Sequence, residues 1–330
     1  MRRLYLFLLP FLLVLTACAV ETGPPVSPQE VSQAQTEIWE IKLREYLRCE
    51  DRVGRILVRV LPVTEHREPH PWFLVQIIDL SRNPPEMERA LSRIFALSLP
   101  EKGYLVTFVH PEIEAQGLRP GAVIQRLETR RLRLGKPVKL RLWNGPLLTL
   151  TPPVVYTEPV NFRIVDSPEP NAWVTPENRM YVTLALCRAL PDDNELAAVV
   201  GHELAHLKRG HLQKRMALFT LRDLLGVGVY ALGGQTARDI YRLGTNFALL
   251  KFSRDQEREA DFYGLWYIYR AGFDLQRASQ VWVHLAAVLP PSGPSLLSTH
   301  PITAERLARI RKIVAAIRSG KTFEELRRGK

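Results

Sequence analysis

Two histidines and a glutamate within one short segment are the residues of this sequence best suited to chemistry. His202, Glu203 and His206 form an H-E-x-x-H pattern. On a helix, residues four apart share one face and lie about 6 Å apart along the axis, so both imidazoles can bind one zinc ion. Glu203 points about 100° around the helix from His202, where it can take a proton from a water activated by the metal. The spacing therefore predicts a catalytic site that holds one Zn²⁺ per chain.

The flanking residues predict that this motif lies on a largely buried helix. Polar residues at 192–194 can cap the helix. Leu196, Val199 and Val200 then give the helix an apolar body that can pack into a core. We therefore expect a helix over 193–210 whose histidines face a cleft.

Helical spacing also predicts helices over 213–232, 236–250, 274–289 and 302–318. The apolar, glycine-containing stretch 224–234 is expected to pack in the core; a mobile lid over the cleft or a shallow membrane contact is the alternative. His211 lies on a different face from His206 and is expected to be structural or exposed, and His284 is expected to be a core or surface residue.

A third metal ligand is expected on a second helix, over 253–271. Glu257 and Asp261 are four residues apart and share one face, whereas Glu259 points elsewhere. Glu257 could complete a His₂Glu site that leaves the fourth position for water. Asp261 could accept a hydrogen bond from a ligand histidine. Taken alone, however, a segment this rich in charge is more often a solvated helix.

Four segments together resemble the HtpX-like and CAAX-prenyl-protease-type zinc metallopeptidases. These segments are GHELAH at 201–206, SRDQEREAD at 253–261, STHP at 298–301 and DSPEPNAW at 166–173. The resemblance extends from about residue 155 to 318, which is about half of the chain. The periplasmic lipoprotein branch, with BepA-like and LoiP-like enzymes, fits better than the membrane-spanning branch, because no apolar run of about 18 residues is present.

The resemblance implies roles for the matching residues. His300 would lie near the metal, where it either stabilises the tetrahedral oxyanion or fills the open position in a latent state. Arg306 would support the oxyanion or the surrounding structure. The rest of the implied site is His202, His206 and Glu257 as zinc ligands, Glu203 as general base and Asp261 beside a ligand histidine.

The resemblance also implies a mainly helical zincin-type (gluzincin) fold with an edge-strand hairpin. Asn171, Ala172 and Trp173 would start the edge strand, which in related enzymes binds an extended substrate by strand addition. The family has a glycine-containing turn where this chain has 176–178. Asn178 can adopt a left-handed conformation, so the hairpin is still expected.

The first residues resemble a bacterial lipoprotein signal. Arg2 and Arg3 precede an apolar run that is too short to span a bilayer. The sequence Leu-Thr-Ala-Cys that ends at Cys18 resembles a lipobox. This predicts an exported protein attached by a lipid on Cys18; an ordinary signal peptide or a short anchor is the alternative.

The segment after Cys18 favours attachment to the outer membrane, facing the periplasm. Ala19 follows the cysteine, where an aspartate would signal retention at the inner membrane. Residues up to about 30 are rich in proline, glycine and serine, as expected for a tether. An exported protein rarely meets nucleic acid, so nucleic acid is not expected as a partner.

A β-rich module is expected between the tether and the catalytic domain. Apolar residues recur at helical spacing over 31–47, and β-type runs then extend from about 53 to 155, interrupted by a helix over 85–98. Part of this segment faintly resembles a PDZ-like module, and an SH3-like barrel or a plain β extension fits it equally well. Basic residues are concentrated over 126–141, which indicates either a solvated strand face or contact with anionic lipid headgroups.

Composition agrees with a folded α+β protein. With 46% hydrophobic and 24% charged residues, the chain is not mostly disordered, and three cysteines exclude a disulfide-dense scaffold. Cys49 and Cys187 could form a disulfide or remain free. The expected organisation is a signal (1–17), a tether (18–30), a helix with a β-rich module (31–154), a zinc metallopeptidase domain (155–320) and a basic tail (321–330).

The function expected from these features is endoproteolysis of unfolded or misassembled cell-envelope proteins. The alternative is a latent or chaperone-like lipoprotein whose zinc site is blocked by His300 and which binds such proteins without cleaving them. A purely structural zinc site is disfavoured, because such sites usually close four protein ligands around the metal. The sequence predicts no oligomeric state.

Overall fold

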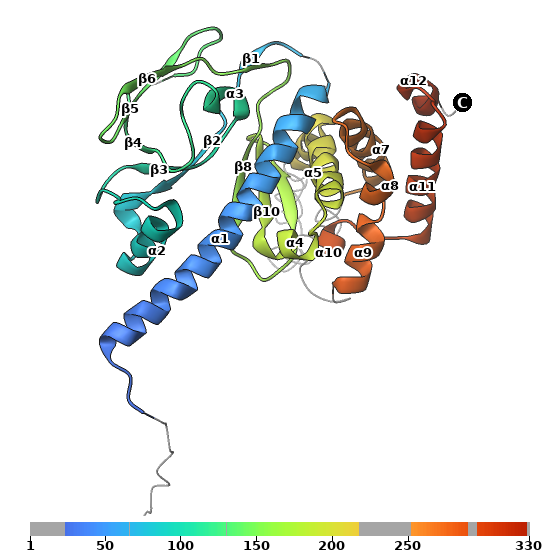
Figure 1. Cartoon of the computed structure of the whole chain (residues 1–330). Helices are drawn as coiled ribbons and strands as arrows, with labels where there is room; N and C mark the ends of the chain where they lie inside the picture. Colours follow the sequence, from blue (N-terminus) through green and yellow to red (C-terminus); the bar gives the residue numbers. More distant parts are fainter. Residues whose placement is uncertain (1–23, 66, 130, 218–251, 290–295, 329–330) are drawn as a thin grey trace, which may run out of the picture.

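The computed structural model describes residues 24–65, 67–129, 131–217, 252–289 and 296–328 (Figure 1). Cys18, the signal before it, the apolar stretch 224–234 and the helix expected over 236–250 lie outside the described residues. The helix expected over 213–232 is described only up to residue 217, and 211–217 are helical. Within the described part, no helix is long and apolar enough to cross a membrane.

A single long helix, α1 (Pro28–Val60), runs along the molecule (Figure 1). It begins with a capping box in which Ser27 and Glu30 bond to each other's backbone amides. The strand expected from residue 53 was wrong. Apolar residues recur there every three to four positions, and the buried ones form one helical stripe: Val53, Ile56, Leu57 and Val60. The helix ends in a 3₁₀ turn, η1 (Leu61–Val63).

The N-terminal module contains a five-stranded antiparallel sheet in the order β2-β3-β4-β5-β6. Its strands are β2 (Val75–Asp79), β3 (Tyr104–Val109), β4 (Val123–Leu127), β5 (Val138–Leu142) and β6 (Leu147–Leu150). The 3₁₀ turn η2 (Leu80–Arg82) and helix α2 (Pro85–Phe95), within the range expected for a helix, join β2 to β3, and α3 (Pro111–Glu114) follows β3. The strand pattern is that of an antiparallel meander.

A second, three-stranded sheet leads into the helical domain. Its order is β8 (Asn161–Val165), β10 (Arg179–Thr183), β9 (Ala172–Thr175), so β9 is an edge strand. Asn178 has φ +57° in the β9–β10 turn, as the sequence suggested. A short antiparallel ladder pairs β1 (His70–Pro71), which precedes the five-stranded sheet in the chain, with β7 (Val154–Val155), which follows it.

The C-terminal half of the described chain is helical. Its helices are α4 (Leu184–Ala189), α5 (Asp193–Lys208), α7 (Arg254–Arg270), α8 (Leu275–Ala278), α9 (Val281–Val288), α10 (Leu296–Thr299), α11 (Ala304–Arg318) and α12 (Phe323–Arg327). The single helix expected over 274–289 is in fact two, α8 and α9. The short α12 lies in the segment expected to be a basic tail.

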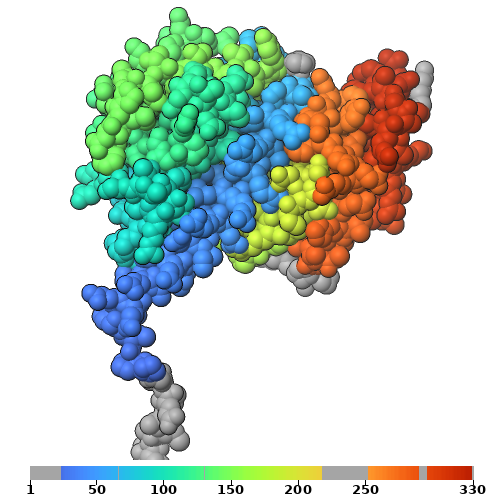
Figure 2. All heavy atoms as spheres, in the orientation of Figure 1, coloured from blue at the N-terminus to red at the C-terminus, as the bar shows by residue number. Residues whose placement is uncertain are grey.

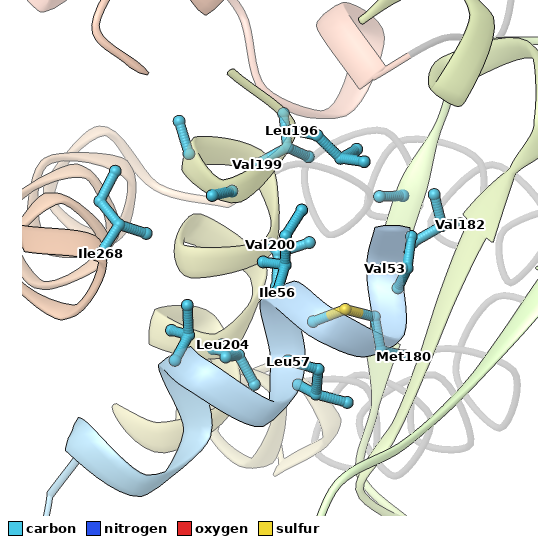
Figure 3. Packing of buried hydrophobic residues seen from close by; sticks show 14 of the residues in the cluster. Val53, Ile56, Leu57, Met180, Val182, Leu196, Val199, Val200, Leu204 and Ile268 are labelled. Carbon is cyan, nitrogen blue, oxygen red and sulfur yellow. The ribbon is translucent and has the colours of Figure 1, made fainter. Parts of the chain in front are cut away.

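Helix α5 lies in the middle of the main core. Figure 3 shows apolar side chains of α1, β10 and α7 meeting those of α5: Val53, Ile56, Leu57, Met180, Val182, Leu196, Val199, Val200, Leu204 and Ile268. A disulfide between Cys49 and Cys187 joins α1 to α4. The helix that carries the H-E-x-x-H motif is thus enclosed on several sides, which holds its side chains in fixed positions.

Candidate metal centre

Two glycines allow α5 and α7 to pack closely beside the motif. A side chain on Gly201 would meet the Gly264 carbonyl oxygen at 2.9 Å, and one on Gly264 would meet the His202 backbone nitrogen at 2.9 Å. Real side chains do not approach this closely. The close packing brings His202 on α5 next to Glu257 and Asp261 on α7.

Four buried residues converge on one point between these helices. His202, His206, Glu257 and His300 offer ligand atoms that all lie within 4.8 Å of one another. The Nε2 atoms of His202 and His206 are 3.1 Å apart, and His300 Nδ1 is 3.2 Å from His202 Nε2. Glu257 Oε1 is 2.8 Å from His300 Nδ1 and 3.4 Å from His206 Nε2.

This arrangement fits a zinc ion. Two ligands about 2.0–2.1 Å from a tetrahedral zinc lie about 3.3 Å from each other, close to the separations observed. In addition, Glu203 Oε1 is buried and makes no hydrogen bond to any described residue, although His300 Nε2 lies 3.3 Å away. Buried polar atoms are normally satisfied, so this atom implies a missing partner in the centre. His202, His206 and Glu257 would hold the metal, and His300 is close enough to be a fourth ligand.

Behind the ligands, Asp261 and Arg306 form a buried ion pair. Arg306 donates from Nε and Nη2 to the two Asp261 carboxylate oxygens, both at 2.8 Å. Asp261 Oδ1 lies 3.1 Å from His202 Nδ1, and Arg306 Nη1 lies 3.1 Å from Glu257 Oε2. Arg306 also donates to the His300 carbonyl oxygen and stacks on Trp282. This pair therefore orients three members of the cluster.

A second chain of contacts reaches His206. Its Nδ1 is 3.0 Å from His211 Nδ1, and His211 Nε2 is 3.0 Å from Glu259 Oε2. If His206 Nε2 is the metal-binding atom, its proton is on Nδ1 and is donated to His211, whose own proton points to Glu259. Arg209 in turn donates to Glu259. This chain fixes the ring orientation of His206.

Burial shifts the acid–base properties of the centre. Loss of solvent raises the pKa of Glu203, although the nearby His300 opposes this effect. Burial also holds the pKa of His206 well below its usual value. For His202, burial acts in the same direction, but contacts with Asp261 and Glu257 outweigh it and raise the pKa to about 9. A raised pKa makes the Glu203 carboxylate a stronger base towards water and brings its pKa nearer to neutral pH.

A cavity of about 550 Å³ opens in front of the cluster. The strand β9 and the turn after it form one wall, and Glu203 and His300 line the cavity floor. Leu212, Met216 and Phe252 add apolar surface. An extended peptide placed along β9 would therefore pass directly over Glu203.

The structure brings together the expected residues and adds some that sequence reasoning missed. Asn171, Ala172 and Trp173 line the cavity. His211, expected to be structural or exposed, is buried and contacts His206. Trp282, under Arg306, and Phe252, beside His206, were not singled out. His284, read as a core or surface residue, contacts Glu195 away from the centre.

A buried H-E-x-x-H helix, with a carboxylate from a second helix and a cleft lined by an edge strand, defines the metallopeptidase class of catalytic domains. Residues 155–314 match the model of Peptidase family M48. The chain therefore carries a metallopeptidase domain of family M48.

Curated relatives agree with this assignment. The chain is 31% identical to "Mitochondrial metalloendopeptidase OMA1" of Schizosaccharomyces pombe, over 44% of this chain and 44% of the relative. It is 28% identical to "Metalloprotease LoiP" of Escherichia coli, over 48% of this chain and 64% of that protein. It is 30% identical to the "Beta-barrel assembly-enhancing protease" of the same organism, over 46% of this chain and 34% of that protein. The chain thus spans less than half the length of the first of these relatives.

Proposed function

We propose that the protein is a zinc-dependent endopeptidase that cleaves unfolded or misassembled proteins of the cell envelope. The observation that carries this proposal is the position of Glu203. Its carboxylate is buried, lies at the floor of the cleft and has one oxygen that no described residue hydrogen-bonds. A carboxylate so placed can act on a water between the metal ligands and a bound peptide.

Several residues of the chain have separate roles in the proposed hydrolysis. When bound, zinc would act as a Lewis acid on the peptide carbonyl and would lower the pKa of water. Glu203 accepts a proton from the attacking water and returns it to the leaving amine. His300 Nε2 lies 3.3 Å from Glu203 Oε1 and lines the same cavity, so it can donate to a substrate carbonyl oxygen on which negative charge develops. Arg306 orients Glu257 and Asp261.

The strand β9 supports an extended, unfolded polypeptide as the substrate. Because β9 is the edge of its sheet, its outer backbone groups can pair with a substrate strand. Folded proteins rarely present a free extended segment, so this mode of binding selects unfolded chains. The name of the β-barrel assembly-enhancing relative and the lipobox-like segment at Cys18 together support an envelope location and an envelope substrate.

A proteolysis assay with casein tests the proposal. Glu203→Gln keeps the size of the side chain and should reduce the rate by about a hundredfold or more, because the general base is lost. Glu195→Gln is the matched control, since Glu195 lies on the same helix but contacts His284 outside the centre. A metal chelator should abolish activity, and re-added zinc should restore it. Equal activity of the Glu203 variant and the control would exclude an enzymatic role for this site.

The arrangement of His300 favours one alternative, a latent protein. His300 Nδ1 lies among the atoms expected to bind metal, so four protein ligands could close the site. His300→Ala distinguishes the two states: activity should rise if His300 blocks the site, and should fall if His300 stabilises the oxyanion. Zinc content, measured in parallel, shows whether the substitution also weakens binding of the metal.

A further inference from the structure

The β4–β5 hairpin of the N-terminal module carries a basic surface that the proposed function does not use. The whole stretch from residue 125 to 137 is exposed where it is described, apart from the partly covered Thr129. Its only acid is Glu128. Among the described residues of the hairpin, the basic side chains are Arg126, Arg131, Arg133, Lys136, Lys139 and Arg141.

These basic side chains are close together in the sequence, and none of them has a carboxylate partner among the described residues. Elsewhere on the protein some exposed arginines are paired, as in Arg44–Glu40 and Arg309–Glu305, and others, such as Arg119, are not. The charge of the hairpin is therefore not balanced from within the part of the chain that is described.

Two of these residues are also placed unfavourably for the sheet. Arg126 on β4 lies directly opposite Arg141 on β5. Like charges in directly opposed positions destabilise a strand pair. An external anion that neutralises both would remove this repulsion, so the pairing points to a partner outside the chain.

The hairpin also exposes apolar side chains between the charges. Leu127 is 55% exposed, and Leu132 and Leu134 are each 47% exposed. A surface that only needs solvation gains nothing from three exposed leucines, and neither does a surface that binds the phosphates of nucleic acid. Basic residues that alternate with apolar ones suit a bilayer surface, where leucines enter the acyl boundary and arginines bind headgroup phosphates.

We propose that the β4–β5 hairpin is a membrane-contact surface that binds anionic phospholipids and inserts Leu132 and Leu134 into the interface. This contact is independent of the lipid expected on Cys18. The strands β4 and β5 lie at the margin of the molecule farthest from α11 and α12, as Figures 1 and 2 show. Bound through this margin, the protein would rest its module on the membrane and turn the helical domain away from it.

Vesicle sedimentation tests the charge contribution. A chain that starts at residue 19 lacks both the apolar segment before Cys18 and Cys18 itself, so its binding depends neither on a lipid nor on that segment. It should bind vesicles of phosphatidylcholine with about 30 mol% phosphatidylglycerol, fail to bind phosphatidylcholine alone, and bind less as salt increases. Arg131→Glu/Arg133→Glu should weaken binding by at least about tenfold.

The matched control makes the same change of charge at another place. Arg311 and Lys312 are exposed on α11, so Arg311→Glu/Lys312→Glu should alter binding by no more than about twofold. Unchanged thermal unfolding midpoints would show that both variants fold. Equal losses in the two variants would mean that net charge, and not the hairpin, attracts the vesicle, and would overturn the proposal.

The leucines distinguish a membrane from other polyanions. Leu132→Ser/Leu134→Ser should weaken binding to the anionic vesicles by about fivefold or more, because apolar insertion is lost. The control changes two exposed valines of α9. Val283→Ser/Val288→Ser should leave binding to the anionic vesicles unchanged. If the leucine variant binds vesicles as tightly as the parent chain, and the parent binds duplex DNA equally well, the hairpin is a general polyanion surface and the membrane proposal is wrong.

Discussion

At the scale of single residues, the metal centre depends on buried polar side chains that each contact two neighbouring polar residues. Asp261 accepts two hydrogen bonds from Arg306 and lies beside His202 Nδ1. Arg306 and His202 together hold the pKa of Asp261 below its usual value despite its burial. A carboxylate kept ionised at this position favours the tautomer of His202 in which Nε2 is free to bind a metal.

The first prediction concerns this carboxylate. Asp261→Asn keeps the shape of the side chain but removes its charge. We expect zinc affinity to fall by about 10–100-fold, because His202 loses the acceptor that orients it. Competition with a chromophoric chelator measures the affinity directly.

The control for this prediction lies on the same helix. Asp255 is exposed at the start of α7 and pairs only with Arg258 among the described residues. Asp255→Asn should leave zinc affinity unchanged. If both variants bind zinc as the parent does, Asp261 does not orient a ligand.

Local spacing explains which site residues could be predicted. His202 and His206 follow from the geometry of one helix turn, and Glu257 and Asp261 from the same rule on α7. His300 and Arg306 came only from family resemblance, because nothing near them in the sequence indicates a metal. The contact of His211 with His206 could not be predicted, because it depends on a bend of the chain after Lys208, where Gly210 has φ +70°.

At the scale of elements, the separation of α5 and α7 sets the geometry of the site. Each helix has a glycine at the point of closest approach, Gly201 and Gly264, and backbone atoms of the partner helix fill the space that a side chain would need. Because the ligands come from both helices, a small change in this separation moves Glu257 relative to His202.

The second prediction tests this contact. In Gly264→Ala, the added methyl group would lie 2.9–3.0 Å from backbone atoms of Gly201 and His202, so the helices must move apart. We expect a loss of about 1–3 kcal/mol in the free energy of unfolding, together with weaker zinc binding. Gly117→Ala is the comparison: its φ of +106° makes it strained, but it has open space around it. It should lower stability without changing zinc affinity, and equal zinc affinities in the two variants would contradict the prediction.

The same elements show where reading the sequence failed. The run over 53–63 is apolar enough for a buried strand, and short apolar runs do not distinguish a strand from a buried helix. The buried positions 53, 56, 57 and 60 follow the period of a helix. This period indicates a helix only when the segment is read as a continuation of the more polar helix before it. The break between α8 and α9 falls at Ser279 and Gln280, residues that carry no strong stop signal.

At the scale of the whole molecule, α1 connects the two halves. Leu43 of α1 packs in a core of the N-terminal module, whereas Val53, Ile56 and Leu57 pack in the core of the metallopeptidase domain. The Cys49–Cys187 disulfide adds a covalent link from this helix to α4. The sequence left this pairing open, because it cannot show that the two Cα atoms lie 5.8 Å apart.

The third prediction concerns the disulfide. It joins residues separated by 138 positions, so its loss should free a long loop in the unfolded chain and reduce stability by about 2–5 kcal/mol. Cys49→Ser/Cys187→Ser should therefore unfold at lower denaturant concentration, and a reductant should bring the parent chain to the same midpoint. Cys18→Ser, which leaves the disulfide intact, should not shift the midpoint. A double variant as stable as the parent would contradict the prediction.

The fourth prediction is a dependence of stability on pH that arises on α1. Glu50 is 2% exposed, and burial raises its pKa to about 7, although Thr107 and Tyr46 partly offset the effect. Its folded-state pKa exceeds the unfolded value of about 4.5, so its contribution is fully present below pH 4.5 and is lost as pH rises through about 7. A shift of this size corresponds to about 3 kcal/mol.

Glu50→Gln cannot ionise and should remove this loss. Relative to the parent chain, the variant should gain about 3 kcal/mol in unfolding free energy between pH 4.5 and pH 8, measured with denaturant at each pH. Glu37→Gln, an exposed change on the same helix, should follow the parent at every pH. A Glu50 variant that also runs parallel to the parent would mean that Glu50 is ionised in the folded protein. In that case, a charge at the contact between α1 and β3 would be tolerated without a buried counter-charge, against the usual cost of burying one.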